Sequence, residues 1–170
     1  MNQYKTNLFE TRNRLLNEIR PFRFDEFNKK PDPNNWSAAQ VCDHLILVEK
    51  AFTKAIVYGL KKEDQKIERK DISGIMDRKK KIDAPEIVIP NSEPIDIQQV
   101  IERLSESRME LLTVLNTIND SSILTGKYAK HPIFGKIPLD QWIELLYMHE
   151  QRHIEQIIEI KGIIGVEKWS

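Results

Sequence analysis

The feature that most constrains the fold is a set of four long stretches in which apolar residues recur every three or four positions. This spacing places the apolar side chains on one face of a helix, so each stretch is predicted to form an amphipathic helix. The predicted helices extend approximately from Gln3 to Arg20, from Ser37 to Gly59, from Asp96 to Ile118 and from Pro138 to Gly162. Four such helices can bury their apolar faces against one another. The expected fold class is therefore all-α, a four-helix bundle formed by one domain over residues 1–170.

Capping residues support two of the helix starts. Ser37 is followed three positions later by Gln40, which predicts a capping box, because each side chain can bind the other residue's free backbone N–H. Asp96 and Gln99 repeat this spacing before the third helix. The second and third helices are therefore expected to begin directly after Ser37 and Asp96.

A long connection separates the second and third predicted helices. It extends over about 36 residues, from Leu60 to Ile95, which is far more than a helical hairpin needs. Such a length allows the chain to cross back over the bundle, so that the two helices it joins run parallel. Within the connection, the segment from Pro85 to Pro90 is predicted to form a short extended piece.

Composition excludes several classes of protein. Lys plus Arg and Asp plus Glu both number 26, and this balance argues against a nucleic-acid-binding protein that neutralises many phosphates. No apolar run approaches the ~20 residues that cross a bilayer, and no signal sequence follows Met1, so we expect a cytoplasmic protein that does not bind membranes. The lone cysteine, Cys42, excludes an intrachain disulfide and a cysteine-based zinc site, and we expect it to be a small packed side chain.

Three of the four histidines interrupt apolar stripes. His149 and His153 are four positions apart on the inner stripe of the fourth helix, and His44 lies between Val41 and Val48 on the second. Three buried imidazoles are costly unless something accepts their lone pairs, and a divalent metal does so. A three-histidine site leaves a coordination position open, which is typical of catalytic rather than structural metal sites. Imidazole suits zinc, nickel, copper or iron.

The string from His149 to His153 also matches the H-E-x-x-H motif of zincin proteases. In the metzincin form of that motif a glycine would stand at Gln156, and no histidine follows His153 to act as the third ligand. His44, upstream, is the better third ligand. Glu150 is then a candidate general base beside the metal, and the alternative is a solvated charge on the flank of the bundle.

Two further residues, Arg108 and His131, have side chains that could reach the site. Arg108 interrupts the apolar stripe of the third helix; it either extends its charge out of the bundle or faces the site and binds a substrate carboxylate. His131 precedes Pro132 in a loop before the fourth helix, and we interpret it as a turn residue without a ligand role.

The motifs together resemble those of the DinB-like superfamily, and in particular its YfiT-like branch of metal-dependent hydrolases. The resemblance covers nearly the whole chain and is carried by Trp36-Ser37, Val41 to Leu45, Glu49, His131 to Gly135, Trp142, and His149-x-x-Arg152-His153-x-x-Gln156-Ile157. It implies a bundle of up-down-down-up topology, which fits the long connection. It also implies a divalent metal, most often nickel or zinc, bound by His44, His149 and His153.

The same resemblance implies chemistry. Relatives include bacillithiol S-transferases and mycothiol-dependent isomerases, in which the metal activates a low-molecular-weight thiol. We therefore expect a metal-dependent enzyme acting on a small molecule, with the metal activating either a thiol cosubstrate, which we favour narrowly, or water, as in a hydrolase. The alternative from another class is a non-enzymatic module that the metal braces. A homodimer is also expected.

Overall fold

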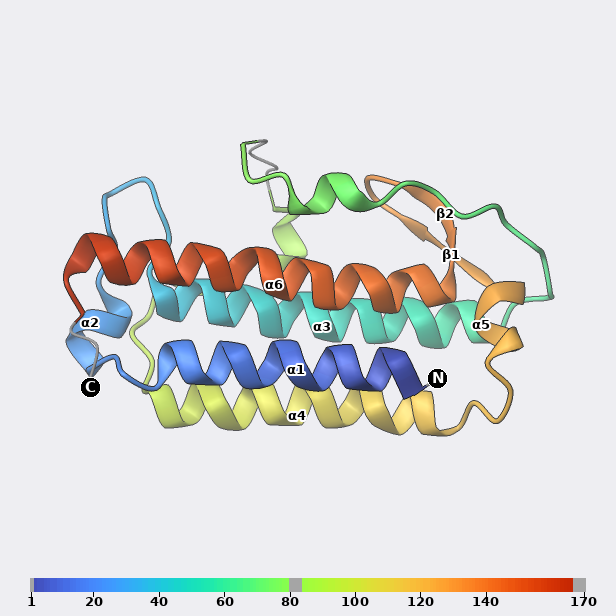
Figure 1. The fold of residues 1–170 in the computed structure, drawn as a ribbon, viewed down its shortest axis with the longest axis horizontal. Coiled ribbons are helices and arrows are strands. Elements are labelled where there is room, and N and C mark those ends of the chain that lie inside the picture. The colour runs from blue at the N-terminus through green and yellow to red at the C-terminus, as the bar shows by residue number, and fades with distance from the viewer. Residues whose placement is uncertain (1, 80–83, 167–170) are drawn as a thin grey trace.

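The computed structural model describes residues 2–79 and 84–166, and within them four long helices form a bundle (Figure 1). These are α1 (Asn2–Ile19), α3 (Ala38–Leu60), α4 (Ile97–Asn116) and α6 (Leu139–Ile164). The shorter elements are helices α2 (Phe24–Asn28) and α5 (Ser122–Gly126), 3₁₀ turns η1 (Ser73–Met76) and η2 (Glu86–Val88), and strands β1 (Tyr128–His131) and β2 (Gly135–Pro138). The predicted all-α four-helix bundle is confirmed.

The topology is up-down-down-up. Figure 1 shows α3 and α4 running in one direction, with α1 and α6 running in the other. Ion pairs agree, because Arg14 pairs with Glu155 and Glu18 with Lys161, so numbers rise together along α1 and α6. The described residues between α3 and α4 lie over the outside of the bundle and lead back to its starting end (Figure 1). The crossover predicted from the length of this connection is therefore present.

The start of α3 matches the sequence pattern. The Ser37 hydroxyl accepts the Gln40 backbone N–H at 3.2 Å, and the Gln40 side-chain oxygen accepts the Ser37 N–H at 3.1 Å. Asp96 also caps α4, but its carboxylate accepts the N–H of Gln98 at 2.7 Å. The reciprocal partner predicted at Gln99 is therefore not the one that Asp96 uses.

The end of α6 differs from the prediction. The helix continues through Gly162 to Ile164 and is ended by Gly165, whose φ of 77° lies in the left-handed region. The N–H of Gly165 binds the carbonyl of Lys161 at 3.0 Å. Glycine is favoured at a C-terminal cap because it has no Cβ to oppose this conformation. The sequence pattern identified the correct residue type but the earlier of two glycines.

Two local elements were not predicted as such. Before α6 the chain forms a small antiparallel hairpin, in which Tyr128 pairs with Pro138 and His131 with Gly135. His131 therefore ends a strand, where a loop was expected. The segment expected to be extended contains the 3₁₀ turn η2 instead. Each strand of the hairpin has four residues and η2 has three. Elements this short do not show a periodic sequence pattern.

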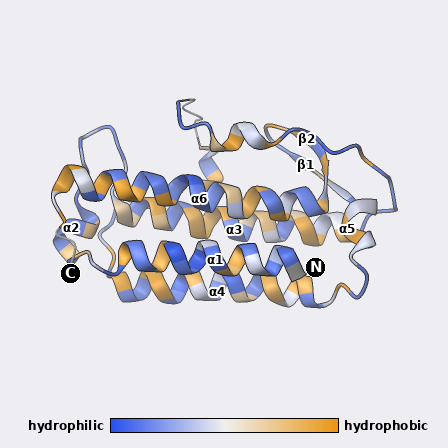
Figure 2. Ribbon diagram, in the orientation of Figure 1, coloured by the Kyte–Doolittle hydropathy of each residue, from blue (hydrophilic) through white to orange (hydrophobic). Residues whose placement is uncertain are grey.

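The interior contains two apolar clusters, and Figure 2 shows the alternation of apolar and polar residues along the long helices. Between the clusters lies a buried charge layer to which each long helix contributes one ionised residue: Arg12, Glu49, Arg108 and Glu150. On α1, for example, Leu8 belongs to one cluster and Leu15 to the other, with Arg12 between them. No helix in the described part of the chain is long and apolar enough to cross a membrane.

Candidate metal centre

The three histidines predicted as ligands converge between α3 and α6. The Nε2 atom of His149 lies 3.4 Å from Nε2 of His44 and 3.1 Å from Nε2 of His153. One ligand nitrogen from each ring lies within 4.8 Å of the other two. Because α3 and α6 are antiparallel neighbours, His44 near the start of α3 meets the middle of α6.

The spacing of these nitrogens fits a shared divalent ion. Two nitrogens bound to one zinc ion at about 2.0–2.1 Å stand roughly 3.3 Å apart in tetrahedral geometry. The two Nε2 separations, 3.4 and 3.1 Å, are close to this value. Without an ion, the single Nε2–H that a neutral His149 can carry would have to serve the lone pairs of both other rings.

The outer nitrogens of two rings are held by acceptors. Nδ1 of His44 lies 2.7 Å from the carbonyl oxygen of Val88 in η2, and Nδ1 of His153 lies 2.7 Å from the side-chain oxygen of Gln156. Because each acceptor requires a donor, the proton belongs on Nδ1 in both rings. This tautomer leaves the Nε2 lone pairs free and directed toward the centre of the cluster.

Electrostatics keep the rings neutral. Burial, with the neighbouring His44 as the second cause, lowers the pKa of His153 to about 3. Burial likewise lowers the pKa of His44, and burial together with His153 and His44 lowers that of His149 well below its ordinary value. At neutral pH all three imidazoles are therefore uncharged, which is the form that binds a metal.

Comparison with known proteins agrees with the fold and the motifs. The sequence profile of the DinB superfamily matches residues 7–157. The chain belongs to the DinB superfamily. The uncharacterized protein YuaE of Bacillus subtilis (strain 168) is 29% identical over 153 residues, which cover 89% of this chain and 93% of YuaE. The resemblance inferred from the sequence motifs is confirmed.

Two solved structures share the bundle. YfiT from Bacillus subtilis, described as a probable metal-dependent hydrolase with an unusual four-helix bundle topology, is 18% identical with a TM-score of 0.70. The match covers 98% of this chain and 88% of YfiT. TT2238, a four-helix bundle protein, is 16% identical with a TM-score of 0.65, over 93% of this chain and 98% of TT2238. At 16% and 18% identity, the likeness to these structures shows a shared fold and does not extend to function.

In this DinB superfamily member, Glu150 lies in the buried charge layer. Its carboxylate accepts hydrogen bonds from Thr11 at 2.5 Å, from Arg12 at 2.7 Å and from Arg108 at 3.1 Å. The alternative of a solvated charge on the flank of the bundle is wrong, because the residue is only 2% exposed. The two arginines engage the carboxylate that a zincin mechanism would leave free. A catalytic role for Glu150 stays a prediction, and these contacts favour a structural one.

Arg108 is also buried, so the expectation that it extends into solvent is wrong. Its guanidinium binds Glu49 at 2.5 Å as well as Glu150, and it donates to the backbone carbonyl of Leu8. Arg108 and Glu150 therefore pair with each other, and neither belongs to the cluster of three histidines. Binding of a substrate carboxylate by Arg108 stays a prediction, and its guanidinium already has two carboxylate partners.

His131 and Cys42 are both buried, and only Cys42 was expected to be a packing residue. Nδ1 of His131 accepts the backbone N–H groups of Ile133 at 3.1 Å and Phe134 at 3.4 Å, which supports the hairpin turn. The ring packs against Trp142 and is not one of the three clustered histidines. Cys42 is fully buried, and burial raises the pKa of its thiol, so it is not a ready nucleophile.

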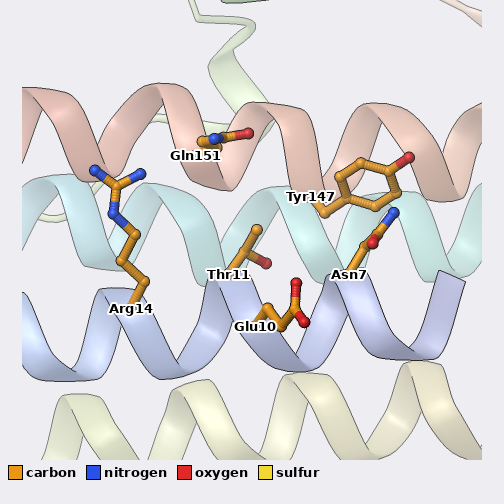
Figure 3. A pocket seen from close by; sticks show the side chains of 6 residues that line it. All are labelled: Asn7, Glu10, Thr11, Arg14, Tyr147 and Gln151. Atoms are coloured by element: carbon orange, nitrogen blue, oxygen red, sulfur yellow. The ribbon is translucent and has the colours of Figure 1, made fainter. Parts of the chain in front are cut away.

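One surface groove is separate from the histidines. It has a volume of about 330 Å³ and lies between α1 and α6 (Figure 3). Its lining residues are Asn7, Glu10, Thr11, Arg14, Tyr147 and Gln151. None of them is a histidine, and the Thr11 hydroxyl is engaged by Glu150, so the groove does not extend the metal centre.

Sequence reasoning assigned no role to Val88 or Gln156, although each contacts one of the three clustered histidines. Gln156 carried a usable signal, because a residue three positions after His153 lies on the same helical face. Val88 carried none, because it acts through its backbone carbonyl and belongs to the crossover connection. Trp36 entered the sequence analysis only as part of the motif Trp36-Ser37, yet its ring lies against His44 with centroids 4.9 Å apart.

Proposed function

We propose that this protein is a metal-dependent enzyme acting on a small molecule, with His44, His149 and His153 holding a divalent ion. The observation that carries the proposal is the convergence of three neutral imidazoles, with one ligand nitrogen from each within 4.8 Å of the others. Zinc and nickel are the ions we expect, because imidazole suits both.

The ligand set favours catalysis over bracing. When bound, the ion would lower the pKa of a coordinated nucleophile toward neutrality. Three neutral imidazoles do not offset the charge of a divalent ion, and they leave coordination positions open. The carboxylate of Glu150, next to His149 in the chain, is engaged by arginines. The three histidines would therefore hold the ion in place, and we assign the activation of the nucleophile to the ion.

The nucleophile is either water or a low-molecular-weight thiol. The description of YfiT as a probable metal-dependent hydrolase supports water, and the chemistry of thiol-dependent relatives supports the thiol. The deciding experiment loads the protein with zinc or nickel and offers ester, amide and alkyl-halide substrates with and without bacillithiol or cysteine. Turnover without thiol indicates hydrolysis. Turnover that requires thiol, with a thioether as product, indicates transfer.

His149→Ala tests the enzyme hypothesis against a metal-braced module. We expect this variant to lose bound metal and turnover, while the melting temperature of the metal-free protein stays close to that of the wild type. A 170-residue bundle has its own apolar core and does not depend on metal as a zinc finger does. Metal analysis and calorimetry provide the readouts.

His131→Asn is the matched control, because His131 is a buried histidine outside the cluster. It should keep the metal. If metal loss from His149→Ala collapsed the fold, and if the bound ion had no exchangeable ligand, the non-enzymatic module would replace the enzyme as our conclusion.

A further inference from the structure

The outer nitrogens of the three ligand rings are not treated alike. His44 has a backbone carbonyl as its Nδ1 partner, and His153 has the side-chain oxygen of Gln156. Nδ1 of His149 is buried and has no hydrogen-bond partner among the described residues. Only one of these arrangements therefore depends on a side chain that substitution can change, and that side chain is Gln156.

The contact is built into the helix. Gln156 follows His153 by three residues on α6, so the two side chains lie on neighbouring turns of the same face. The 2.7 Å separation is that of a good hydrogen bond. The adjacent apolar residues Ile154 and Ile157 are buried in the core and hold this part of the helix in place. The amide oxygen of Gln156 thus contacts the ring of His153 on a segment of helix that the core holds in place.

We propose that Gln156 is a positioning residue for the metal ligand His153. By accepting the Nδ1–H of His153, it selects the tautomer with a free Nε2 lone pair and fixes the rotation of the ring about its Cβ–Cγ bond. The proposal rests on the proposed metal-dependent function. Partners of this kind, which contact the ligand and not the metal, typically contribute about 10- to 100-fold to metal affinity.

The use of an amide instead of a carboxylate has its own consequence. A carboxylate at position 156 would accept the same N–H more strongly and would make Nε2 a better ligand. It would also add a negative charge beside the site. A neutral acceptor orients His153 without reducing the net charge of the metal centre. The order of metal affinity should therefore be Glu at least equal to Gln, and both above Leu.

The test measures the dissociation constant for Zn²⁺ by competition with a chromogenic chelator. Gln156→Leu, which keeps the size but removes the acceptor, should bind about 10- to 100-fold more weakly than wild type. Gln156→Glu should bind at least as tightly. Gln151→Leu is the matched control, an exposed glutamine on the same helix, and should bind within about twofold of wild type. Melting temperatures of the metal-free proteins show whether each variant is folded.

A second readout needs no metal. In the metal-free protein, ¹⁵N spectra of the histidine rings should show His153 with its proton on Nδ1, and this signal should weaken or exchange faster in Gln156→Leu. If the wild type bound no divalent ion, the proposed function would fail, but this readout would still decide the role of Gln156. The proposal is overturned if the tautomer of His153 is unchanged in Gln156→Leu, if that variant binds Zn²⁺ as the wild type does, or if Gln156→Glu weakens binding as much as leucine.

Discussion

The buried charge layer allows a quantitative test of how the bundle is held together. Two arginines and two glutamates balance in charge, and each is at most 8% exposed: Arg12, Glu49, Arg108 and Glu150. Glu150→Gln keeps the shape but removes one negative charge, which leaves a net positive charge among residues shielded from water. Breaking a buried ion pair in this way costs about 3–5 kcal/mol of unfolding free energy. For a domain of this size that corresponds to a melting temperature lower by about 6–20 °C.

The control for this change lies on the same two helices. Arg14 pairs with Glu155 between α1 and α6, but both side chains are more than 40% exposed, so Arg14→Gln should cost at most about 1 kcal/mol. The assay is urea unfolding followed by circular dichroism, with a chelator present so that metal binding does not contribute. If the two variants lost the same stability within about 1 kcal/mol, the layer would not hold the bundle in the way we infer.

The same layer predicts the sign of a pH effect. Burial alone would raise the pKa of Glu150, but the charges of Arg12 and Arg108 outweigh burial and lower it. The contribution of Glu150 is therefore complete above the ordinary glutamate pKa and is lost as the pH falls below it. The difference in stability between wild type and Glu150→Gln should shrink on acidification through this range.

Three further predictions concern other parts of the fold. Burial lowers the pKa of His131 to about 4, so its contribution to stability is complete above pH 6.5, the ordinary value, and declines as the pH falls toward 4; unfolding free energies of the metal-free protein should vary less with pH in His131→Asn, and equal slopes would contradict this. A Cβ at Gly59 would lie 2.5 Å from Leu139 and 2.9 Å from the Tyr128 carbonyl, so Gly59→Ala should lower stability by about 1–3 kcal/mol, whereas Gly162→Ala, which has open space within α6, should raise it by up to about 1 kcal/mol in the same denaturation assay. Light scattering should give twice the monomer mass, as expected for a homodimer; a monomer mass at micromolar concentration would count against that expectation.

The long helices and the convergence of the three histidines could be predicted from the sequence because most of their signals are local. The apolar period of each helix and the Ser37–Gln40 box depend on residues a few positions apart, and these contacts form whatever the rest of the chain does. His149 and His153 share a face for the same reason. His44 is distant in sequence, but its place on an apolar stripe directed it to the same core.

Only the tertiary structure decided the environment of the charged residues. A lone arginine or glutamate on a helix is more stable in water than in a core, so sequence reasoning placed Glu150 and Arg108 near solvent or the site. Burial becomes possible only when opposite charges arrive from other helices, here Arg12 from α1 and Glu49 from α3, to replace the lost hydration. The contact of the Val88 carbonyl with His44 also depends on tertiary structure. It requires the long crossover connection to pack against α3 at this point, and residues next to Val88 in the sequence do not determine that position.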